Sequence, residues 1–170
     1  MTMLATAQIQ PIAFLDRDGA LIFEPTDTFQ IDRPDLLKIL DGVVAGLQWL
    51  QQKGYRLVLV TNQNGLGTAA FPYKNFAVPH EQFLATLAAA GVKFERIFIC
   101  PHLPTENCDC RKPNTALVDA WLAQQTYDRA QSFMYGDRDT DAEFARRLNI
   151  RFVRATINCP FEQSKFTFIK

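Results

Sequence analysis

The stretch "IAFLDRDG", residues 12–19, joins a short apolar run to two aspartates and a glycine. Four consecutive apolar side chains at 12–15 predict a buried β-strand of the kind found in parallel sheets. Asp16 and Asp18 follow where that strand ends. The order predicts a buried strand with acidic groups at its carboxyl end.

The composition of the whole chain is that of a soluble globular protein. Its 170 residues are 48% apolar and 21% charged, and no apolar run approaches the roughly 20 residues of a membrane helix. Residues 1–11 lack the charged-then-apolar order of a signal peptide, so we expect a cytoplasmic protein. Eighteen basic and eighteen acidic side chains cancel. This balance argues against long nucleic acid or an anionic membrane as partner, but allows a small anionic ligand.

Short apolar runs alternate with helical segments along the chain. We expect strands over 12–15, 56–60, 96–100, 132–135 and 151–153. We expect helices over 43–52, 80–90, 115–124 and 140–148. The alternation predicts an α/β fold with a parallel sheet covered by helices on both faces. We expect a single domain over residues 1–170, with residues 1–11 as a flexible N-terminal extension.

Polar side chains follow three of the predicted strands. Asp16 and Asp18 follow the first, Thr61 and Asn62 the second, and Asp137 the fourth. Open α/β sheets bind ligands outside the carboxyl ends of their strands, so these groups should converge. Crowded carboxylates repel one another unless they are protonated or bind a cation, and oxygen ligands favour Mg²⁺.

This set of groups suits phosphoryl transfer. A carboxylate nucleophile and a divalent cation fit a reaction through an aspartyl-phosphate. Lys112 and the Thr61 hydroxyl are donors suited to an anion. The long loop at residues 18–40, which we call the flap, is expected to lie over this site.

A second motif, "FICPHLPTENCDCRKP" at residues 98–113, gathers three of the four cysteines and one of the two histidines. A Cys₃His set matches a closed tetrahedral zinc site, which is structural because it keeps no open position for water. Its ligands would be Cys100, His102, Cys108 and Cys110. A disulfide between two cysteines separated by one residue would be strained, but reduced, unliganded cysteines stay an alternative. This zinc loop, residues 100–111, leads directly into Lys112 and should aim that side chain.

The motifs resemble, in order, the four motifs of the haloacid-dehalogenase-like (HAD) phosphatases: Asp16-x-Asp18-Gly19, Thr61-Asn62, Lys112-Pro113 and Gly136-Asp137-x3-Asp141. The resemblance implies a Rossmann-like fold, here with a short flap and the zinc loop instead of a large cap domain. It also implies catalytic Mg²⁺ and structural Zn²⁺.

The same resemblance implies roles for individual residues. Asp16 would be the nucleophile, and Asp18 would be the general acid for the leaving alkoxide and then the base for water. The Mg²⁺ ligands would be Asp16, Asp137 and the backbone carbonyl of Asp18. The phosphoryl group would be held by Thr61, Asn62, Arg111 and Lys112. Asp141 would position Lys112 or a metal-bound water.

Over residues 12–151 the chain resembles one family more closely, the histidinol-phosphate phosphatases of histidine biosynthesis. The matching segments are "FLDRDG", "FQIDR", "TNQNGLGTAAFP", "CPHLPTENCDCRKP" and "GDRDTD". The resemblance implies hydrolysis of L-histidinol phosphate to L-histidinol. We expect Glu24 and Gln30 to contact the substrate, Glu24 through the substrate ammonium. In many organisms this domain is fused to imidazoleglycerol-phosphate dehydratase, so the chain is expected to be a stand-alone enzyme or one part of such a protein.

Three other functions stay open. The first is a heptose 1,7-bisphosphate 7-phosphatase, whose family shares the catalytic motifs and the cysteine loop. The second is a polynucleotide 3′-phosphatase, and the third is an inactive, zinc-stabilised interaction module. Ala20 and Asn64 depart from the resembling family, which usually has threonine and aspartate there. We expect the remaining histidine, His80, to cap a helix or lie on the surface.

Overall fold

Five parallel strands form the centre of the fold in the computed structural model, which describes residues 9–170. They are β1 (Ile12–Leu15), β2 (Arg56–Asn62), β3 (Phe94–Cys100), β4 (Phe133–Gly136) and β5 (Arg151–Arg154). Their order in the sheet is β3-β2-β1-β4-β5. The strand of the opening motif is therefore central, with a partner on each side, and the predicted α/β fold is confirmed.

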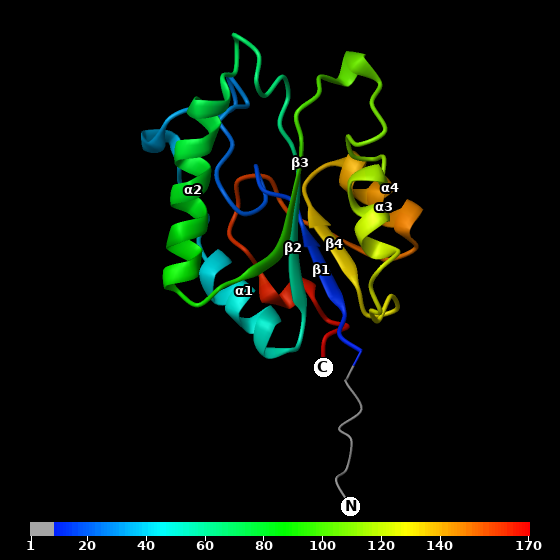
Figure 1. Cartoon of the computed structure of the whole chain (residues 1–170). Coiled ribbons are helices and arrows are strands. Elements are labelled where there is room, and N and C mark those ends of the chain that lie inside the picture. Colours follow the sequence, from blue (N-terminus) through cyan, green and yellow to red (C-terminus); the bar gives the residue numbers. More distant parts are fainter. Residues whose placement is uncertain (1–8) are drawn as a thin grey trace, which may run out of the picture.

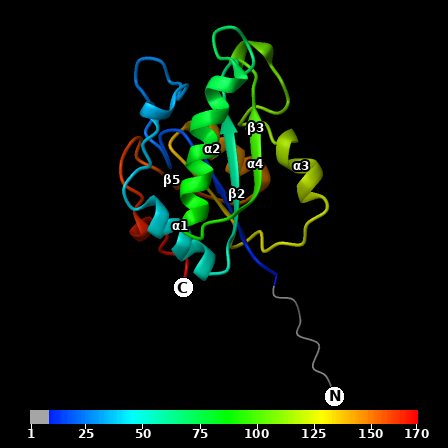
Figure 2. The same cartoon turned by 60° about the vertical axis from the view of Figure 1, so that its left-hand side comes forward.

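Helices cover both faces of this sheet. They are α1 (Val43–Gln52), α2 (Tyr73–Ala89), α3 (Ala116–Leu122) and α4 (Asp139–Leu148), with short 3₁₀ helices at Pro34–Leu36, Pro104–Glu106 and Gln163–Lys165. α1 and α2 lie on one face and α3 and α4 on the other (Figure 1). Two views show the long loops together at the end to which the strand arrows point (Figures 1 and 2). Within residues 9–170 no helix is long and apolar enough to cross a membrane.

The core is split by the sheet into two layers. Side chains alternate along β1, so that Ile12 and Phe14 join the layer under α3 and α4, while Leu15 joins the layer under α1 and α2. The layer under α1 and α2 also contains aromatic side chains from the C-terminal segment, among them Phe161 and Phe166. Burial on both faces explains why the run at 12–15 is entirely apolar.

One predicted helix boundary differs from the structure. α2 begins at Tyr73, not at residue 80, and Pro79 lies inside it. Proline costs a helix one backbone hydrogen bond, but here it lies on the buried face, where tertiary packing outweighs that cost. The flexible extension expected over residues 1–11 lies mostly outside the described residues. The carbonyls of Gln10 and Pro11 accept hydrogen bonds from the backbone N–H groups of Asp128 and Arg56, so these two residues are held in place.

The packing of α1 on the C-terminal segment gives a test of the core. A Cβ added at Gly46 would lie 2.2 Å from Phe161 Cδ1. We therefore expect Gly46→Ala to lower the free energy of unfolding by about 1–3 kcal/mol, despite a helix-propensity gain of about 1 kcal/mol. Urea unfolding would measure the change. The substitution should cost less in a Phe161→Leu background, and a more stable Gly46→Ala protein would show that this contact is not tight.

Candidate active site

Three carboxylates meet at the carboxyl end of the sheet. Asp16 follows β1, Asp137 follows β4, and Asp141 lies in the first turn of α4. One oxygen from each lies within 4.8 Å of the others. The convergence predicted for Asp16 and Asp137 is therefore present, and the third side chain of the cluster is Asp141 rather than Asp18. We call Asp16, Asp137 and Asp141 the acidic cluster.

Gly136 permits the close approach of Asp141. A Cβ at position 136 would lie 2.4 Å from Asp141 Oδ2. The same carboxylate oxygen accepts the backbone N–H of Arg138 at 3.1 Å, which fixes Asp141 at the start of α4. The glycine before Asp137 thus lets the first turn of the helix fold back over the end of β4.

Lys112 is buried between two of these carboxylates. Its Nζ lies 2.8 Å from Asp16 Oδ1 and 2.6 Å from Asp141 Oδ1, and the lysine is 2% exposed. The Asn62 side chain holds the backbone of Lys112: Asn62 Oδ1 accepts its N–H at 3.0 Å, and Asn62 Nδ2 donates to its carbonyl at 3.1 Å. The zinc loop therefore ends on β2, with Lys112 directed at Asp16.

The electrostatics of the cluster favour a bound cation. Burial raises the pKa of Asp16 to about 8, Asp141 and Asp137 act in the same direction, and Lys112 opposes them. Burial also raises the pKa of Asp137. Among the described residues, buried Asp137 Oδ1 has no hydrogen-bond partner. Clustered carboxylates with one unpartnered oxygen fit Mg²⁺, whose positive charge would restore the ionised forms.

The Asp18 side chain lines a narrow inner cavity with Asp16 but is not one of the three carboxylates of the acidic cluster. Arg17 donates to it from Nε, at 2.8 Å from Oδ1, and from Nη2, at 3.1 Å from Oδ2. Gln63 Nε2 also donates to Asp18 Oδ2, at 2.6 Å, and to the Thr61 hydroxyl oxygen, at 2.8 Å. Gln63 thus links two predicted site residues. The sequence motifs alone indicate no role for Arg17 or Gln63.

His80 is buried behind this network, and the prediction that it caps a helix or lies on the surface is wrong. The residue is 7% exposed, its Nδ1 lies 3.2 Å from Arg17 Nη1, and its ring stacks on Phe76 with centroids 4.7 Å apart. Because α2 begins seven residues earlier than expected, position 80 is two turns inside the helix. The helical spacing of Phe76, His80, Phe83 and Leu87 is the sequence signal that marks this buried face.

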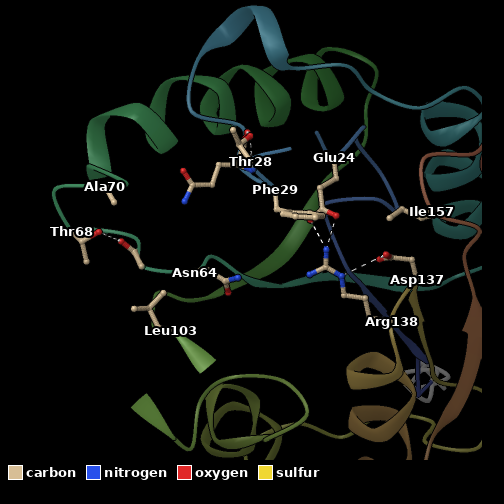
Figure 3. A pocket seen from close by; sticks show the side chains of 12 residues that line it. Glu24, Thr28, Phe29, Asn64, Thr68, Ala70, Leu103, Asp137, Arg138 and Ile157 are labelled. Atoms are coloured by element: carbon tan, nitrogen blue, oxygen red, sulfur yellow. Dashed lines mark hydrogen bonds and ion pairs between the residues drawn. The ribbon is translucent and has the colours of Figure 1, made fainter. Parts of the chain in front are cut away.

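An open hollow of about 680 Å³ lies beside the acidic cluster (Figure 3). Flap residues form one wall, and residues following β2 and β3 form the other (Figure 3). Glu24 and Asp137 both point toward Arg138 in Figure 3. Arg138 Nη2 lies 2.5 and 2.6 Å from the two Glu24 oxygens. Glu24 and Arg138 also line the narrow inner cavity with Asp16, Thr61 and Lys112, so this ion pair lies where the hollow meets the cluster.

The other predicted site residues lie in the hollow or form contacts with other side chains and backbone groups of the protein. The predicted substrate residue Gln30 lines the hollow, and Glu24 is 3% exposed and paired with Arg138. Arg111 Nη1 donates to Asn64 Oδ1 at 2.6 Å and to the His102 carbonyl at 3.3 Å. The ligand contacts predicted for these residues, and for Asn62, stay predictions.

The four predicted zinc ligands are gathered at one point. Cys100 Sγ lies 3.6 Å from His102 Nδ1 and from Cys108 Sγ, and 3.3 Å from Cys110 Sγ. Tetrahedral zinc with bonds of about 2.3 Å places its sulfur ligands roughly 3.7 Å apart. The Cys₃His set therefore fits Zn²⁺, with all four positions filled by protein. The fourth cysteine, Cys159, is free and outside this group.

Known structures share this architecture. A HAD-superfamily hydrolase from Ehrlichia chaffeensis is 14% identical to this chain, with a TM-score of 0.60. The match covers 96% of this chain and 98% of the Ehrlichia chain. A D,D-heptose 1,7-bisphosphate phosphatase from B. bronchiseptica, solved with magnesium and phosphate, is 28% identical with a TM-score of 0.74. The match covers 84% of this chain and 79% of the B. bronchiseptica chain. The fold and its strand-end site define a HAD-like phosphatase.

The sequence narrows this class further. The family model Polynucleotide kinase 3 phosphatase matches residues 11–156, and the chain belongs to that family. The Histidine biosynthesis bifunctional protein HisB of Legionella pneumophila (strain Lens) is 46% identical over 145 residues, 85% of this chain. HisB of Buchnera aphidicola subsp. Schizaphis graminum is 39% identical over 160 residues, 94% of the chain. The chain spans 41% and 43% of these two relatives, about two fifths of their length.

The zinc ligands can be tested by substitution. We expect wild-type protein to bind about one zinc ion per chain, as a closed Cys₃His site would. Cys108→Ala/Cys110→Ala should lose this zinc and unfold at a lower temperature, because metal binding stabilises the folded loop. Metal analysis and thermal unfolding would check both. Cys159→Ala is the matched control and should keep its zinc, whereas zinc retained by the double variant would contradict the assigned ligands.

His80 predicts a pH dependence of stability. Burial lowers the pKa of His80 to about 4, and Arg17 acts in the same direction while Asp18 opposes. An unfolded histidine has a pKa of about 6.5, so between pH 6.5 and 4 the unfolded chain binds a proton that the folded chain does not. The free energy of unfolding should therefore fall as the pH falls through this window. Urea unfolding of wild type and His80→Asn would test it, and equal pH slopes would contradict it.

Proposed function

We propose that this protein is a Mg²⁺-dependent phosphomonoester hydrolase that dephosphorylates L-histidinol phosphate through an aspartyl-phosphate. The observation that carries the proposal is the buried Asp16 carboxylate, 2.8 Å from Lys112 Nζ within the acidic cluster. The curated relatives named for histidine biosynthesis support the choice of substrate. In this proposal residues 1–170 form one phosphatase domain.

The proposed reaction has two displacements at phosphorus. The Asp16 carboxylate attacks the phosphoryl group, the bond to the substrate oxygen breaks, and Asp18 supplies a proton to the leaving alkoxide. Asp18 then accepts a proton from a water molecule that attacks the aspartyl-phosphate, which releases phosphate and restores Asp16. Lys112 and Thr61 hold the phosphoryl oxygens. Bound Mg²⁺ supplies positive charge that stabilises the developing phosphoryl charge.

The residues around the acidic cluster fit a metal in this role. Asp16 and Asp137 would ligate Mg²⁺ together with the backbone carbonyl of Asp18. Asp141 would position Lys112, because its Oδ1 lies 2.6 Å from Lys112 Nζ. Burial lowers the pKa of Lys112, but Asp141 and Asp16 outweigh this and raise it above its ordinary value. Lys112 therefore stays charged and can donate hydrogen bonds to the phosphoryl oxygens. The Asn62 amide and Arg111 would complete the phosphate site from its edge.

The open hollow suits a substrate with a cationic and a flat polar part. Histidinol phosphate carries an ammonium and an imidazole. Glu24 supplies a carboxylate for the ammonium; burial raises its pKa, and Arg138 opposes that rise. Gln30 supplies an amide that can both donate to and accept from the imidazole nitrogens. Arg138 would share Glu24 with the substrate.

The zinc loop and the reduced thiols complete the proposal. Zinc would be structural, since its four ligands leave no position for substrate. All four cysteines are free, as expected for a protein of the reducing cytoplasm, the compartment we propose. The proposed partner is imidazoleglycerol-phosphate dehydratase, by fusion or association, because the curated relatives are bifunctional and longer than this chain.

One alternative substrate has a specific observation in its favour. The heptose bisphosphate phosphatase of B. bronchiseptica is 28% identical over 84% of this chain. The description of the family model adds a third candidate, a 3′-phosphorylated polynucleotide. All three are phosphomonoesters, so one assay can compare them.

The test is phosphate release with Mg²⁺ from histidinol phosphate, heptose 1,7-bisphosphate and a 3′-phosphorylated oligonucleotide. We expect the highest kcat/KM with histidinol phosphate. Asp16→Asn should lower it by about 10⁴-fold or more, because the nucleophile is lost. Asp35→Asn, at an exposed position, is the control and should match wild type. A higher kcat/KM with another substrate would overturn the proposed specificity, and full activity of Asp16→Asn would overturn the mechanism.

A further inference from the structure

Arg17 is the largest polar side chain buried in the described part of the protein. It is 1% exposed, although it stands between Asp16 and Asp18 in sequence. A buried guanidinium is costly unless its charge is paired and its N–H groups are satisfied. The side chain must therefore be fixed by what surrounds it.

Several kinds of contact surround this guanidinium. Nε and Nη2 donate to the two oxygens of Asp18, and Nη2 also lies 3.3 Å from Gln63 Oε1. Nη1 lies 3.2 Å from His80 Nδ1. The guanidinium carbon lies 4.7 Å from the centroid of the Phe76 ring, a cation–π distance. Arg17 is thus held between Asp18 on one side and α2 on the other.

The contact with His80 fixes the state of the imidazole. A guanidinium only donates hydrogen bonds, so His80 Nδ1 must be the unprotonated, accepting nitrogen. Its ring is held in turn by stacking on Phe76, one turn earlier in α2. His80 does not line the hollow or the inner cavity, so it would not contact a bound substrate and can act on it only through Arg17.

We propose that Arg17 and His80 are positioning residues that fix the orientation of the Asp18 carboxylate. The inference rests on the proposed function, in which Asp18 protonates the leaving alkoxide. The fork of Arg17 sets the plane of that carboxylate, and His80 sets the plane of the fork. Misplacing a catalytic group by about 1 Å can cost roughly 10²-fold in rate. The efficiency of leaving-group protonation therefore depends on a histidine 62 positions after Asp18 in sequence.

Leaving-group dependence separates this role from simple packing. p-Nitrophenyl phosphate has a leaving group that departs without a proton, whereas an alkyl phosphate needs one. His80→Leu removes the accepting nitrogen but keeps apolar bulk. We expect kcat/KM to fall about 10²-fold for histidinol phosphate and less than about 10-fold for p-nitrophenyl phosphate. kcat/KM is the right quantity because it covers only the steps up to loss of the leaving group.

Two matched variants serve as controls. His80→Asn retains an acceptor near the Nδ1 position and should restore kcat/KM to within about threefold of wild type. Leu87→Val, a buried change on the same helix two turns after His80, should lower thermal stability but leave the ratio between the two substrates unchanged. If His80→Leu does not fold, Arg17→Lys carries the same test, since it keeps the charge and loses the fork.

The outcomes are distinguishable. Equal losses for both substrates, or no loss, in an active and folded His80→Leu protein would overturn the inference and leave the proposed function standing. If wild type favours another alkyl phosphate, that substrate replaces histidinol phosphate in the comparison. If wild type releases phosphate from no phosphomonoester, the proposed function fails and the inference fails with it.

Discussion

A buried ammonium group is the constraint on which the site depends. Lys112 Nζ lies between Asp16 and Asp141 at the carboxyl end of the sheet, with almost no exposure to water. Such a charge is stable only where carboxylates surround it. Since Asp137 adds another carboxylate with an unpartnered oxygen, the cluster holds more negative than positive charge. A divalent cation would balance this excess negative charge.

Several local features hold Lys112 and its carboxylate partners in place. Asn62 fixes the backbone of Lys112, and Gly136 makes room for Asp141. The Cys₃His group shapes the loop that brings the lysine in from β3. Each feature comes from a different strand end, which is why residues far apart in sequence form one site. Parallel sheets make this possible because all their strands end on the same side.

Sequence patterns predicted the strands and the aspartates better than they predicted the contacts between side chains. An apolar run before Asp16 is a local signal, and parallel topology then brings Asp137 to the same edge. The pairing of Arg138 with Glu24, or of Arg17 with His80, depends on how loops and α2 pack, and no local pattern encodes that. The sequence predicts a shorter α2 because proline normally interrupts a helix, whereas Pro79 is buried inside α2, where tertiary packing outweighs its cost.

The backbone pairing of Asn62 with Lys112 has a consequence for the wall of the hollow. One end of the zinc loop is fixed in β3 at Cys100, and the other is fixed to β2. The intervening segment, with its 3₁₀ turn at Pro104–Glu106, carries Leu103 into the hollow and is otherwise largely exposed. Residues 103–107, which lie between His102 and Cys108, contain no assigned zinc ligand, so we expect a change of their length to leave Lys112 in place. The fold thereby allows one wall of the hollow to change while Lys112 and the acidic cluster keep their places.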